Sequence, residues 1–191
     1  GIGRRQRQMC IRDRSFSAAE NQTSIGTVTA TDVDTDNASI TFSISGSELS
    51  ITSGGVLTFA STPDYETKSS YSATVTASDG TNSSTQDITV TVTNVNDNSP
   101  VFTSGAAFSV VENQTGISTI TATDDDGDTL SFSLSGTDAS SMSINSSSGV
   151  LVFDSAPDYE TKTSYSATVT ASDGINSVSY THLTLPTTYT V

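Results

Sequence analysis

Carboxylate side chains, which occur in the same order twice along the chain, are the groups in this sequence best able to do chemistry. The first set lies in Glu-Asn, Asp-x-Asp, Asp-Tyr-Glu and Ala-Ser-Asp-Gly motifs and consists of Glu20, Asp32, Asp34, Asp64, Glu66 and Asp79. The same motifs return in a second set, which consists of Glu112, Asp124, Asp126, Asp158, Glu160 and Asp173. Carboxylates are preferred ligands of Ca²⁺, which takes about six to eight oxygen atoms. Both sets therefore indicate binding of a hard divalent cation.

A short segment rich in Asn and Asp separates the two sets. It reads Asn94-Val-Asn96-Asp97-Asn98-Ser-Pro100-Val-Phe102. Amide side chains and backbone carbonyls can complete the oxygen shell that carboxylates begin around Ca²⁺. The segment is therefore a further candidate source of ligands.

Catalytic chemistry finds less support in the residue types. Nucleophilic catalysis needs a base or a thiol, and Cys10 and His182 are the only residues of their kinds, both outside residues 15–177. A carboxylate pair as in glycosidases is conceivable for Asp64 and Glu66. We interpret that pair as metal ligands instead, because residues two apart on a strand project to the same side and one ion can then contact both. The same holds for Asp124 and Asp126 if that stretch is extended. We expect that the protein is not an enzyme.

Two other interpretations of the acidic residues are an EF-hand loop and solvated turns. An EF-hand loop needs Gly at its sixth position, where the run beginning at Asp124 has Thr129. A single Asp-x-Asp is often just a solvated turn, and we interpret Asp125 and Asp128 in this way, although Asp128 could lend its carbonyl. For the other residues, four motifs in a constant order, present twice, favour cation binding.

Short apolar sets with a period of two residues must position these carboxylates. In the first half they are Ile25/Val28/Ala30, Ile40/Phe42/Ile44, Val56/Leu57/Phe59, Tyr71/Ala73/Val75/Ala77 and Ile88/Val90/Val92, with further strands near 16–19 and 49–51. About seven short strands separated by turns are typical of an immunoglobulin-like sandwich. We predict an all-β protein of two tandem Greek-key β-sandwiches.

Self-similarity along the chain defines the two domains. Glu20–Thr23 recurs as Glu112–Thr115 with an offset of 92, and Tyr71–Gly80 recurs as Tyr165–Gly174 with an offset of 94. The offset grows in turn-like stretches, as loop insertions should make it grow. We expect a first repeat over residues 15–97 and a second, truncated repeat over residues 98–177.

The motifs and their order resemble those of cadherin repeats over about 160 residues. Two positions depart from the family pattern: Tyr65 stands where the family usually has Arg, and Asn94 where its linker usually begins with Asp. The resemblance implies cadherin-type sandwiches with Ca²⁺ bound between consecutive repeats. Neutral Asn94 puts one ligand position in doubt, whereas Tyr65 should matter little.

The resemblance also implies which residues hold the metal. The complete site would use Glu20, Asp64, Glu66, Asn96, Asp97, Asn98 (through its carbonyl), Asp124, Asp126 and Asp173. Two incomplete half-sites would consist of Asp32, Asp34 and Asp79 at one end and of Glu112, Asp158 and Glu160 at the other. The complete site carries seven negative charges, which about three Ca²⁺ ions would nearly cancel.

Charge narrows the possible partners. Residues 15–177 contain two lysines and twenty acidic residues, a net charge of −18, which disfavours nucleic acid and anionic membranes. No apolar run is long enough for a transmembrane helix, so we expect any anchor or secretion signal outside this piece. Because residues 15–177 contain no cysteine, a secreted chain of such small domains needs a stabilising element other than disulfides.

The expected function is structural: extracellular, calcium-rigidified repeats of a cell-surface adhesion protein. Neighbouring repeats of the same chain are the expected partners, with another cell-surface protein or a glycan as further possibilities. The near-identity of the repeats and their Ser/Thr/Asp-rich composition resemble bacterial cadherin-like surface adhesins, whereas animal cadherins with homophilic adhesion are the other source. The alternative function is a calcium-dependent carbohydrate- or protein-binding module.

The two ends of the chain have a different character. All five arginines lie in the first fourteen residues, and Arg4–Arg14 reads as a translation of a transposase adapter used in sequencing libraries. The reverse complement of the same DNA translates to Val178–Thr187. We therefore interpret residues 1–14 and 178–191 as adapter-like tails without function. The other interpretation, a basic arm for nucleic acid, finds less support.

The second repeat should consequently lack its native final strand. In the first repeat, residues 83–92 supply this strand, whereas its counterpart after Gly174 runs into the adapter-like text. Val178 and Tyr180 happen to alternate, so a strand can still form there.

Overall fold

The structure, a computed structural model, describes residues 10–32 and 40–187, with side chains described up to residue 181. The chain divides into two compact units, Gly1–Val95 and Asn96–Val191. Asp34, one of the expected half-site residues, lies outside the described residues.

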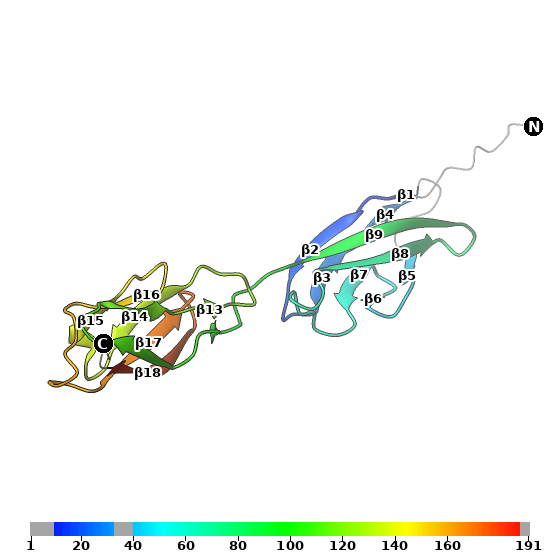
Figure 1. The fold of residues 1–191 in the computed structure, drawn as a ribbon. Helices are drawn as coiled ribbons and strands as arrows, with labels where there is room; N and C mark the ends of the chain where they lie inside the picture. The colour runs from blue at the N-terminus through cyan, green and yellow to red at the C-terminus, as the bar shows by residue number, and fades with distance from the viewer. Residues whose placement is uncertain (1–9, 33–39, 188–191) are drawn as a thin grey trace, which may run out of the picture. The chain divides into compact units, whose positions relative to one another are not determined.

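Unit 1 is a sandwich of two sheets (Figure 1). Its strands are β1 (Cys10–Ile11), β2 (Ser15–Ala19), β3 (Ser24–Thr27), β4 (Ala30–Thr31), β5 (Thr41–Ile44), β6 (Leu49–Ile51), β7 (Val56–Phe59), β8 (Ser70–Ser78) and β9 (Ser83–Thr93). One sheet has the order β2-β9-β8-β5, the other β3-β7-β6, and β1 pairs with β4. Each apolar set expected from the sequence lies on or beside one of these strands.

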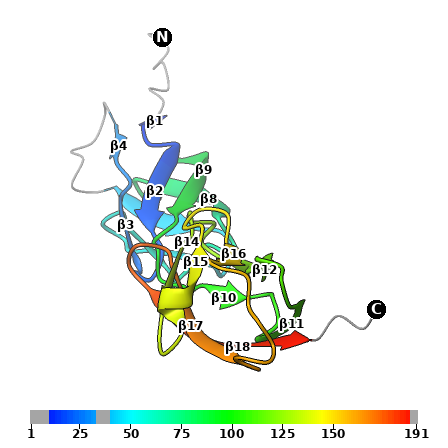
Figure 2. The ribbon, with the colours of Figure 1, turned by 60° about the vertical axis from the view of Figure 1, so that its left-hand side comes forward.

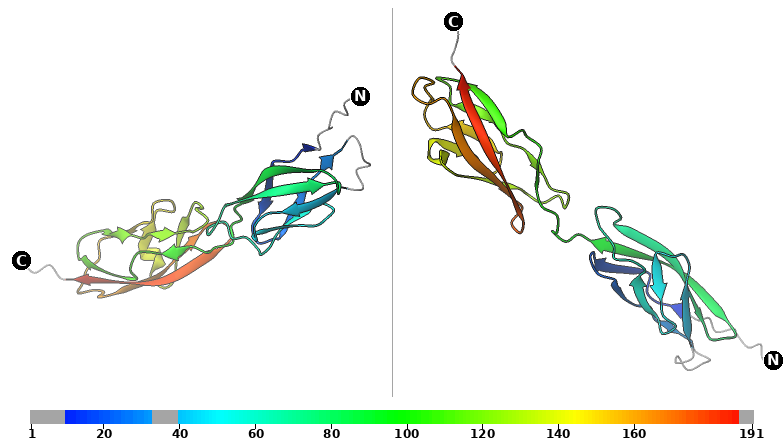
Figure 3. Two further views of the ribbon diagram at one scale, coloured as in Figure 1. Left: turned by 90° about the vertical axis from the view of Figure 1, so that its right-hand side faces the viewer. Right: turned by 90° about the horizontal axis from the view of Figure 1, so that it is seen from below.

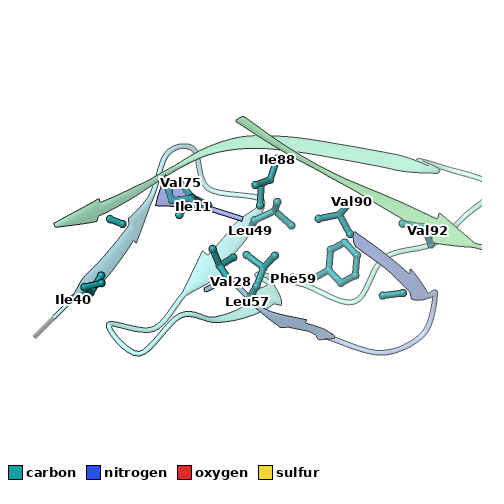
Figure 4. Close-up of a cluster of buried hydrophobic side chains, with 12 residues drawn as sticks. Ile11, Val28, Ile40, Leu49, Leu57, Phe59, Val75, Ile88, Val90 and Val92 are labelled. Atoms are coloured by element: carbon teal, nitrogen blue, oxygen red, sulfur yellow. The ribbon is translucent and has the colours of Figure 1, made fainter. Parts of the chain in front are cut away.

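The core of unit 1 lies between the two sheets, as Figure 4 shows. Strand β9 illustrates the period-two pattern, since Ile88, Val90 and Val92 are buried while the residues between them are exposed. Leu57 and Phe59 of the opposite sheet pack into the same cluster. The ring of Phe59 meets that of Tyr71 edge-on, with 5.1 Å between the ring centroids.

Unit 2 repeats this plan. Its elements are β10 (Val101–Phe102), β11 (Ala107–Val111), β12 (Gly116–Thr119), β13 (Ala122–Thr123), β14 (Ser131–Ser135), the 3₁₀ turn η2 (Ala139–Ser141), β15 (Met142–Ile144), β16 (Val150–Phe153), β17 (Tyr165–Ser172) and β18 (Ser177–Thr187). The sheets have the orders β11-β18-β17-β14 and β12-β16-β15, and β10 pairs with β13. The long strand β18 lies beside β17 in both views of Figure 3.

The first and last long strands of each unit run parallel, β2 beside β9 and β11 beside β18, whereas all the other pairs in the described chain are antiparallel. Strands adjacent in sequence, such as β5 and β6, lie in different sheets. This crossing between sheets is typical of immunoglobulin-like sandwiches. The predicted all-β fold class is confirmed.

Residues expected to be a tail take part in the fold of unit 1. Strand β1 pairs with β4, as Figure 2 shows, and Ile11 is buried in the core. The Arg12 N–H donates to the Thr29 carbonyl, and Asp13 accepts hydrogen bonds from the N–H and hydroxyl of Thr29. Cys10 and Ile11 thereby occupy the place that Val101 and Phe102 hold in unit 2. The edge of the folded unit therefore lies before the expected boundary at Ser15.

Candidate metal centre

The Asp126 carboxylate organises the segment that opens unit 2. Its Oδ2 accepts the backbone N–H groups of Asp97 and Asn98, at 3.0 and 2.8 Å. Its Oδ1 accepts the Asn98 side-chain amide at 3.1 Å. Strand β13 ends three residues earlier, at Thr123, and the bend that follows it presents the Asp126 carboxylate to the segment 96–98.

Asn176, in the turn between β17 and β18, fastens the same segment from the other side. Its Nδ2 donates to Asn96 Oδ1 and to the Asn98 carbonyl, both at 2.9 Å. Asp173 in turn accepts the N–H groups of Ile175 and Asn176 at 2.7 and 2.6 Å, which fixes this turn. Residues far apart in the sequence, Asn96, Asn98 and Asp173, are thus collected around one point of unit 2.

Two carboxylate oxygens at this point have no hydrogen-bond partner within the described chain. They are Asp124 Oδ2 and Asp173 Oδ2, and both atoms are buried. Burying an anionic oxygen without a partner is costly. A cation bound at either oxygen would remove its share of that cost, so these donors fit a hard metal ion.

The protonation state of Asp173 also favours a cation. Burial raises the pKa of this carboxyl, but hydrogen bonds from the Ile175 and Asn176 backbone and from the Asn176 and Asn96 side chains outweigh it and leave the pKa below its ordinary value. The group is therefore ionised at neutral pH. An ionised carboxylate with one free oxygen is a competent ligand for Ca²⁺.

Asp124, Asp126 and Asp128 form the acidic edge of this site. One oxygen of each lies within 4.8 Å of the others. The backbone here is a bend rather than an extended strand, because the Asp126 N–H folds back onto Asp124 Oδ1 at 3.0 Å. The expectation for Asp124 and Asp126 depended on an extended backbone, which this stretch does not have. A turn, rather than strand alternation, brings these side chains together. The turn also brings in the carboxylate of Asp128, which the sequence analysis interpreted as a solvated residue that could lend only its carbonyl.

Glu20 is the most buried of the predicted ligands, with 3% of its surface exposed. In unit 1 its two carboxylate oxygens accept the backbone N–H groups of Tyr65 and Val95, at 2.7 and 2.8 Å. One oxygen of Glu66 lies within 4.8 Å of one of Glu20. Glu20 therefore joins the Asp-Tyr-Glu motif to the end of the unit, and it remains able to share its lone pairs with a metal.

The sequence suggested that the first Asp-Tyr-Glu motif lies on a strand, but it does not. Residues 65–67 form a turn in which Asp64 accepts the N–H and the hydroxyl of Thr67, each at 3.0 Å. An Asx-type turn competes here with an extended strand, because the Asp side chain can accept hydrogen bonds from the backbone and the Thr side chain three residues later. The alternation argument for Asp64 and Glu66 was therefore wrong.

The second Asp-Tyr-Glu motif assembles in the same way within unit 2. Glu112 accepts the Tyr159 N–H at 3.0 Å, and Asp158 accepts the Glu160 N–H at 3.0 Å. One oxygen from each of Glu112, Asp158 and Glu160 lies within 4.8 Å of the others. Hydrogen bonds from the Thr161 hydroxyl and the Glu160 backbone outweigh desolvation and hold the pKa of Asp158 below its ordinary value. Three predicted half-site residues are thus together.

At the remaining end of unit 1, Asp79 lies in the turn between β8 and β9. Backbone hydrogen bonds from Asn82 and Thr81 lower the pKa of its carboxyl, and a side-chain hydrogen bond with Asp32 lowers it further. Asp32 and Asp79 are therefore neighbours, as the half-site interpretation requires.

Sequence reasoning missed Asn176. Its amide holds Asn96 and Asn98 in place, and its counterpart Asn82 contacts Asp79 in unit 1. A signal was present, because the motif Ala-Ser-Asp-Gly-x-Asn is complete in both repeats. Only the carboxylate in this motif was considered, whereas the Asn three residues later positions the carbonyl-bearing segment.

Two sandwiches with acidic turns at their ends define the class of this protein as cadherin-like. Residues 14–93 match the family model of the Cadherin domain. The mouse (Mus musculus) Protocadherin Fat 4 is 36% identical to this chain over 165 residues, which cover 77% of this chain and 3% of that protein. The chain is therefore built from cadherin-like repeats.

Solved structures give the same result for the fold. The chain matches the Protocadherin gammaB7 EC3-6 cis-dimer structure with a TM-score of 0.77, 29% identity and coverage of 94% of this chain and 49% of that chain. It matches human Protocadherin-24 EC1-2 with a TM-score of 0.79 and 21% identity over 95% of this chain and 98% of that chain. The latter likeness concerns the fold alone. Among the described residues, no helix is long and apolar enough to cross a membrane.

Proposed function

We propose that this chain is a pair of calcium-binding repeats of an extracellular adhesion protein, stiffened where the repeats meet. The observation that carries the proposal is the pair of buried, unpartnered oxygens of Asp124 and Asp173 beside the segment 96–98. A chain that had to fold without metal would pair or expose such atoms. Calcium is the cation whose oxygen preference and flexible geometry suit this donor set.

The ligands that we propose follow the resemblance to cadherin repeats. In unit 2 the ions would take oxygens from Asn96, Asp97, Asn98, Asp124, Asp126 and Asp173. From unit 1 they would take Glu20, Asp64 and Glu66. Glu112, Asp158 and Glu160 would begin a further site, as would Asp32, Asp34 and Asp79. We propose no catalytic role for any of these carboxylates.

We expect calcium to stiffen the junction by removing the repulsion between its carboxylates. Without metal, carboxylates a few ångströms apart repel each other by about 1 to 4 kcal/mol per close pair, depending on the local dielectric. Bound Ca²⁺ replaces this repulsion with attraction and immobilises the side chains that share it. The junction should therefore be flexible without calcium and stiff with it. Extracellular modules of this kind bind with Kd on the order of 10⁻⁴–10⁻³ M, which matches extracellular rather than cytosolic calcium.

The chain is extracellular, in keeping with its similarity to the solved extracellular domain of Protocadherin GammaB4 and the ectodomain of human Desmocollin-1. It spans 3% of the length of Protocadherin Fat 4. The partners of a whole adhesion protein are therefore proposed by analogy: adjacent repeats first, and another cell-surface protein or a glycan second. Of these, the cis-dimer named for Protocadherin gammaB7 supports lateral contact between repeats as a model.

We further propose that residues 15–97 and 98–177 are the functional repeats and that the flanking residues are adapter-like, in a protein of the bacterial surface-adhesin type. Support comes from the composition, since all five arginines lie in the first fourteen residues and none in the repeats. Strand β1 shows that part of the first flank can still pack on the sandwich. An adapter-like segment can pack in this way if it places a single apolar residue, here Ile11, at a core position.

A calcium titration followed by chelation tests the proposed function. The melting temperature of the full chain should rise with millimolar Ca²⁺ and fall back with chelator, because an ion that binds only the folded state stabilises it by mass action. Asp97→Ala should remove most of this rise. Asp87→Ala is the matched control, since this exposed carboxylate lies within β9 rather than in an acidic turn and accepts a hydrogen bond from the Thr74 hydroxyl. An unchanged melting temperature on chelation would refute the calcium proposal.

A further inference from the structure

The last strands of the two units can be compared position by position, because their pairings are equivalent. In unit 1, Ala73 pairs with Ile88, Tyr71 with Val90 and Ala18 with Val92. In unit 2, the corresponding Ala167, Tyr165 and Val110 pair with His182, Thr184 and Pro186. The three most buried positions of β9, at 0–1% exposure, therefore correspond to His, Thr and Pro in β18.

Pro186 differs most from its counterpart in unit 1, Val92. In unit 1 the Val92 N–H donates to the Ser69 carbonyl at 2.9 Å. Pro186 has no N–H to give, and β18 is an inner strand of its sheet, between β11 and β17. Proline is disfavoured in inner strands for this reason. The second half of β18 therefore matches neither the hydrogen-bonding nor the apolar pattern of the strand that this sandwich uses in unit 1.

The neighbouring strand β11 lies beside an open hollow. The hollow has a volume of about 370 Å³ and is lined by Ser109, Val110, Val111, Gln114 and Gly116. Val110 and Val111 are the residues that pair with Pro186 and Thr187. The hollow therefore lies beside residues of β11 that pair with the end of β18.

From this register we propose that the strand position between β11 and β17 is a strand-acceptor site. Its ligand is an extended peptide with β-branched apolar residues at the three positions held by His182, Thr184 and Pro186. The peptide displaces the end of β18 and pairs in parallel with β11 and in antiparallel with β17. Affinity comes from backbone hydrogen bonds and selectivity from the alternate apolar side chains, as in other strand-addition complexes.

The chain itself shows what the peptide must look like. Ser83–Thr93 fills the equivalent position of unit 1, with Ile88, Val90 and Val92 at the core and hydroxyl residues between them. The strands that would receive it are nearly the same in both units, since Tyr165–Ser172 repeats Tyr71–Ser78 letter for letter. A peptide with the sequence of Ser83–Thr93 is therefore the probe.

The resident strand competes with such a peptide. A segment tethered by a short turn has an effective concentration on the order of millimolar. The peptide must outweigh this advantage through the core positions, where the resident strand has no Ile or Val. We therefore expect binding in the micromolar range rather than tighter, and only after the second half of β18 opens.

The first experiment tests the strand position in cis. The triple variant His182→Ile, Thr184→Val, Pro186→Val places the residues of β9 at the three positions and should raise the melting temperature of the full chain by several degrees. Leu183→Thr with Leu185→Thr is the matched control, because these positions correspond to the exposed Thr89 and Thr91 and should tolerate threonine. A triple variant no more stable than the parent would overturn the register argument.

The second experiment tests binding in trans. The fluorescently labelled Ser83–Thr93 peptide is titrated with the full chain, and a peptide with Ser at the positions of Ile88, Val90 and Val92 serves as the control. Hydrogen exchange should then show slower exchange of β11 and β17 amides with the first peptide only. Binding should weaken at least tenfold in the triple variant, whose own strand competes better. Equal binding of both peptides, or protection of β2 and β8 instead, would overturn the proposal.

Discussion

At the scale of single residues, carboxylate oxygens divide into those that bond the protein backbone and those that are left for a cation. The Asp126 carboxylate accepts the backbone N–H groups of Asp97 and Asn98, and the Glu20 carboxylate accepts that of Val95, so both orient the backbone at these places. Asp124 and Asp173 each keep a buried oxygen without a hydrogen-bond partner in the described chain. Asp126 and Glu20, which are proposed ligands, therefore also position backbone segments, whereas Asp124 and Asp173 each have one oxygen that is not engaged in a hydrogen bond within the described chain.

Asn176 offers a test of positioning apart from ligation. Asn176→Ala removes the amide that holds Asn96 Oδ1 and the Asn98 carbonyl, so these oxygens lose their orientation. We expect the calcium affinity to fall by about tenfold, as is common for partners that orient metal ligands. Isothermal titration with Ca²⁺ measures the change, and Asn82→Ala in unit 1 is the control. Equal losses in the two variants would argue against the specific role of Asn176.

A second residue-scale prediction concerns acid stability. The hydrogen bond with Lys162, followed by the Ser166 N–H, holds the pKa of Asp138 below its ordinary value although desolvation raises it. Since the folded-state pKa is lowered, this stabilisation is fully present above the unfolded pKa of about 4 and is lost as the pH falls through the folded-state pKa. Asp138→Asn should therefore flatten the loss of stability in acid.

Denaturant unfolding between about pH 5 and pH 2.5, with chelator present, measures this effect. Glu48→Gln is the matched control, because Lys68 and Glu48 form the equivalent ion pair at 2.5 Å but the Glu48 side chain is 55% exposed, against 13% for Asp138. An exposed pair contributes little. A slope that changes more in Glu48→Gln than in Asp138→Asn would contradict the assignment.

At the scale of elements, close backbone contacts fix the turn between β6 and β7 and its counterpart between β15 and β16. Gly55 has φ +91°, and a Cβ there would lie 2.4 Å from the Val28 carbonyl oxygen. Its own carbonyl accepts the Val28 N–H at 2.8 Å, so the turn before β7 is bonded closely to the chain after β3. Gly149 repeats this contact with Ile120 in unit 2. Glycine is required there by space as well as by backbone angle.

Substitution separates these two requirements. Gly55→Ala should cost well above the 1–2 kcal/mol of a positive φ alone, because its Cβ would meet backbone that cannot move away cheaply. Gly46→Ala is the control, since Gly46 has φ +81° and open space around it. Urea unfolding of both variants measures the difference. Equal losses would show that the close approach at Val28 relaxes without cost.

At the scale of the whole molecule, the acidity of the repeats is the property that calcium must balance. Residues 15–177 carry a net charge of −18, with Lys68 and Lys162 as their two basic residues. Each lysine contacts a carboxylate and also lies over a tyrosine ring, 4.6 Å from the ring centroid. These lysines are therefore engaged within their own units, and in our proposal cations from solution balance the charge of the acidic turns.

This dependence predicts how salt acts on the calcium-free protein. Raising NaCl from about 0.01 to 0.15 M shortens the Debye length from about 30 to 8 Å and screens repulsion among the carboxylates. The melting temperature in chelator should therefore rise with NaCl, whereas in saturating Ca²⁺ it should change less. Calorimetry at both salt concentrations measures this. A larger salt effect with calcium than without it would contradict a charge-balancing role.

Much of the fold could be predicted from the sequence, because strand alternation is a local property. The apolar sets Tyr71–Ala77 and Ile88–Val92 lie on β8 and β9 as expected, with alternate residues in the core. The repeat of the acidic motifs likewise predicted which side chains gather, for example Glu112 with Asp158 and Glu160. Motifs that recur in one order reflect one fold used twice.

The geometry of the acidic groups depended on tertiary structure. Asp64 and Asp124 lie in turns rather than strands, because hydrogen bonds to their own backbone compete with extended pairing. Asn176 acts through contacts about eighty residues away, which no local pattern could reveal. The mismatch of Pro186 likewise emerged only from its pairing with Val110.

The sequence by itself thus determined the class of fold, the repeat and the identity of the acidic side chains, since all three are properties of order and spacing along the chain. Only the tertiary structure decided which oxygens are left over for a cation, namely those of Asp124 and Asp173. The physical reason is that hydrogen bonds compete for each oxygen, and the outcome depends on which distant N–H groups the fold brings near.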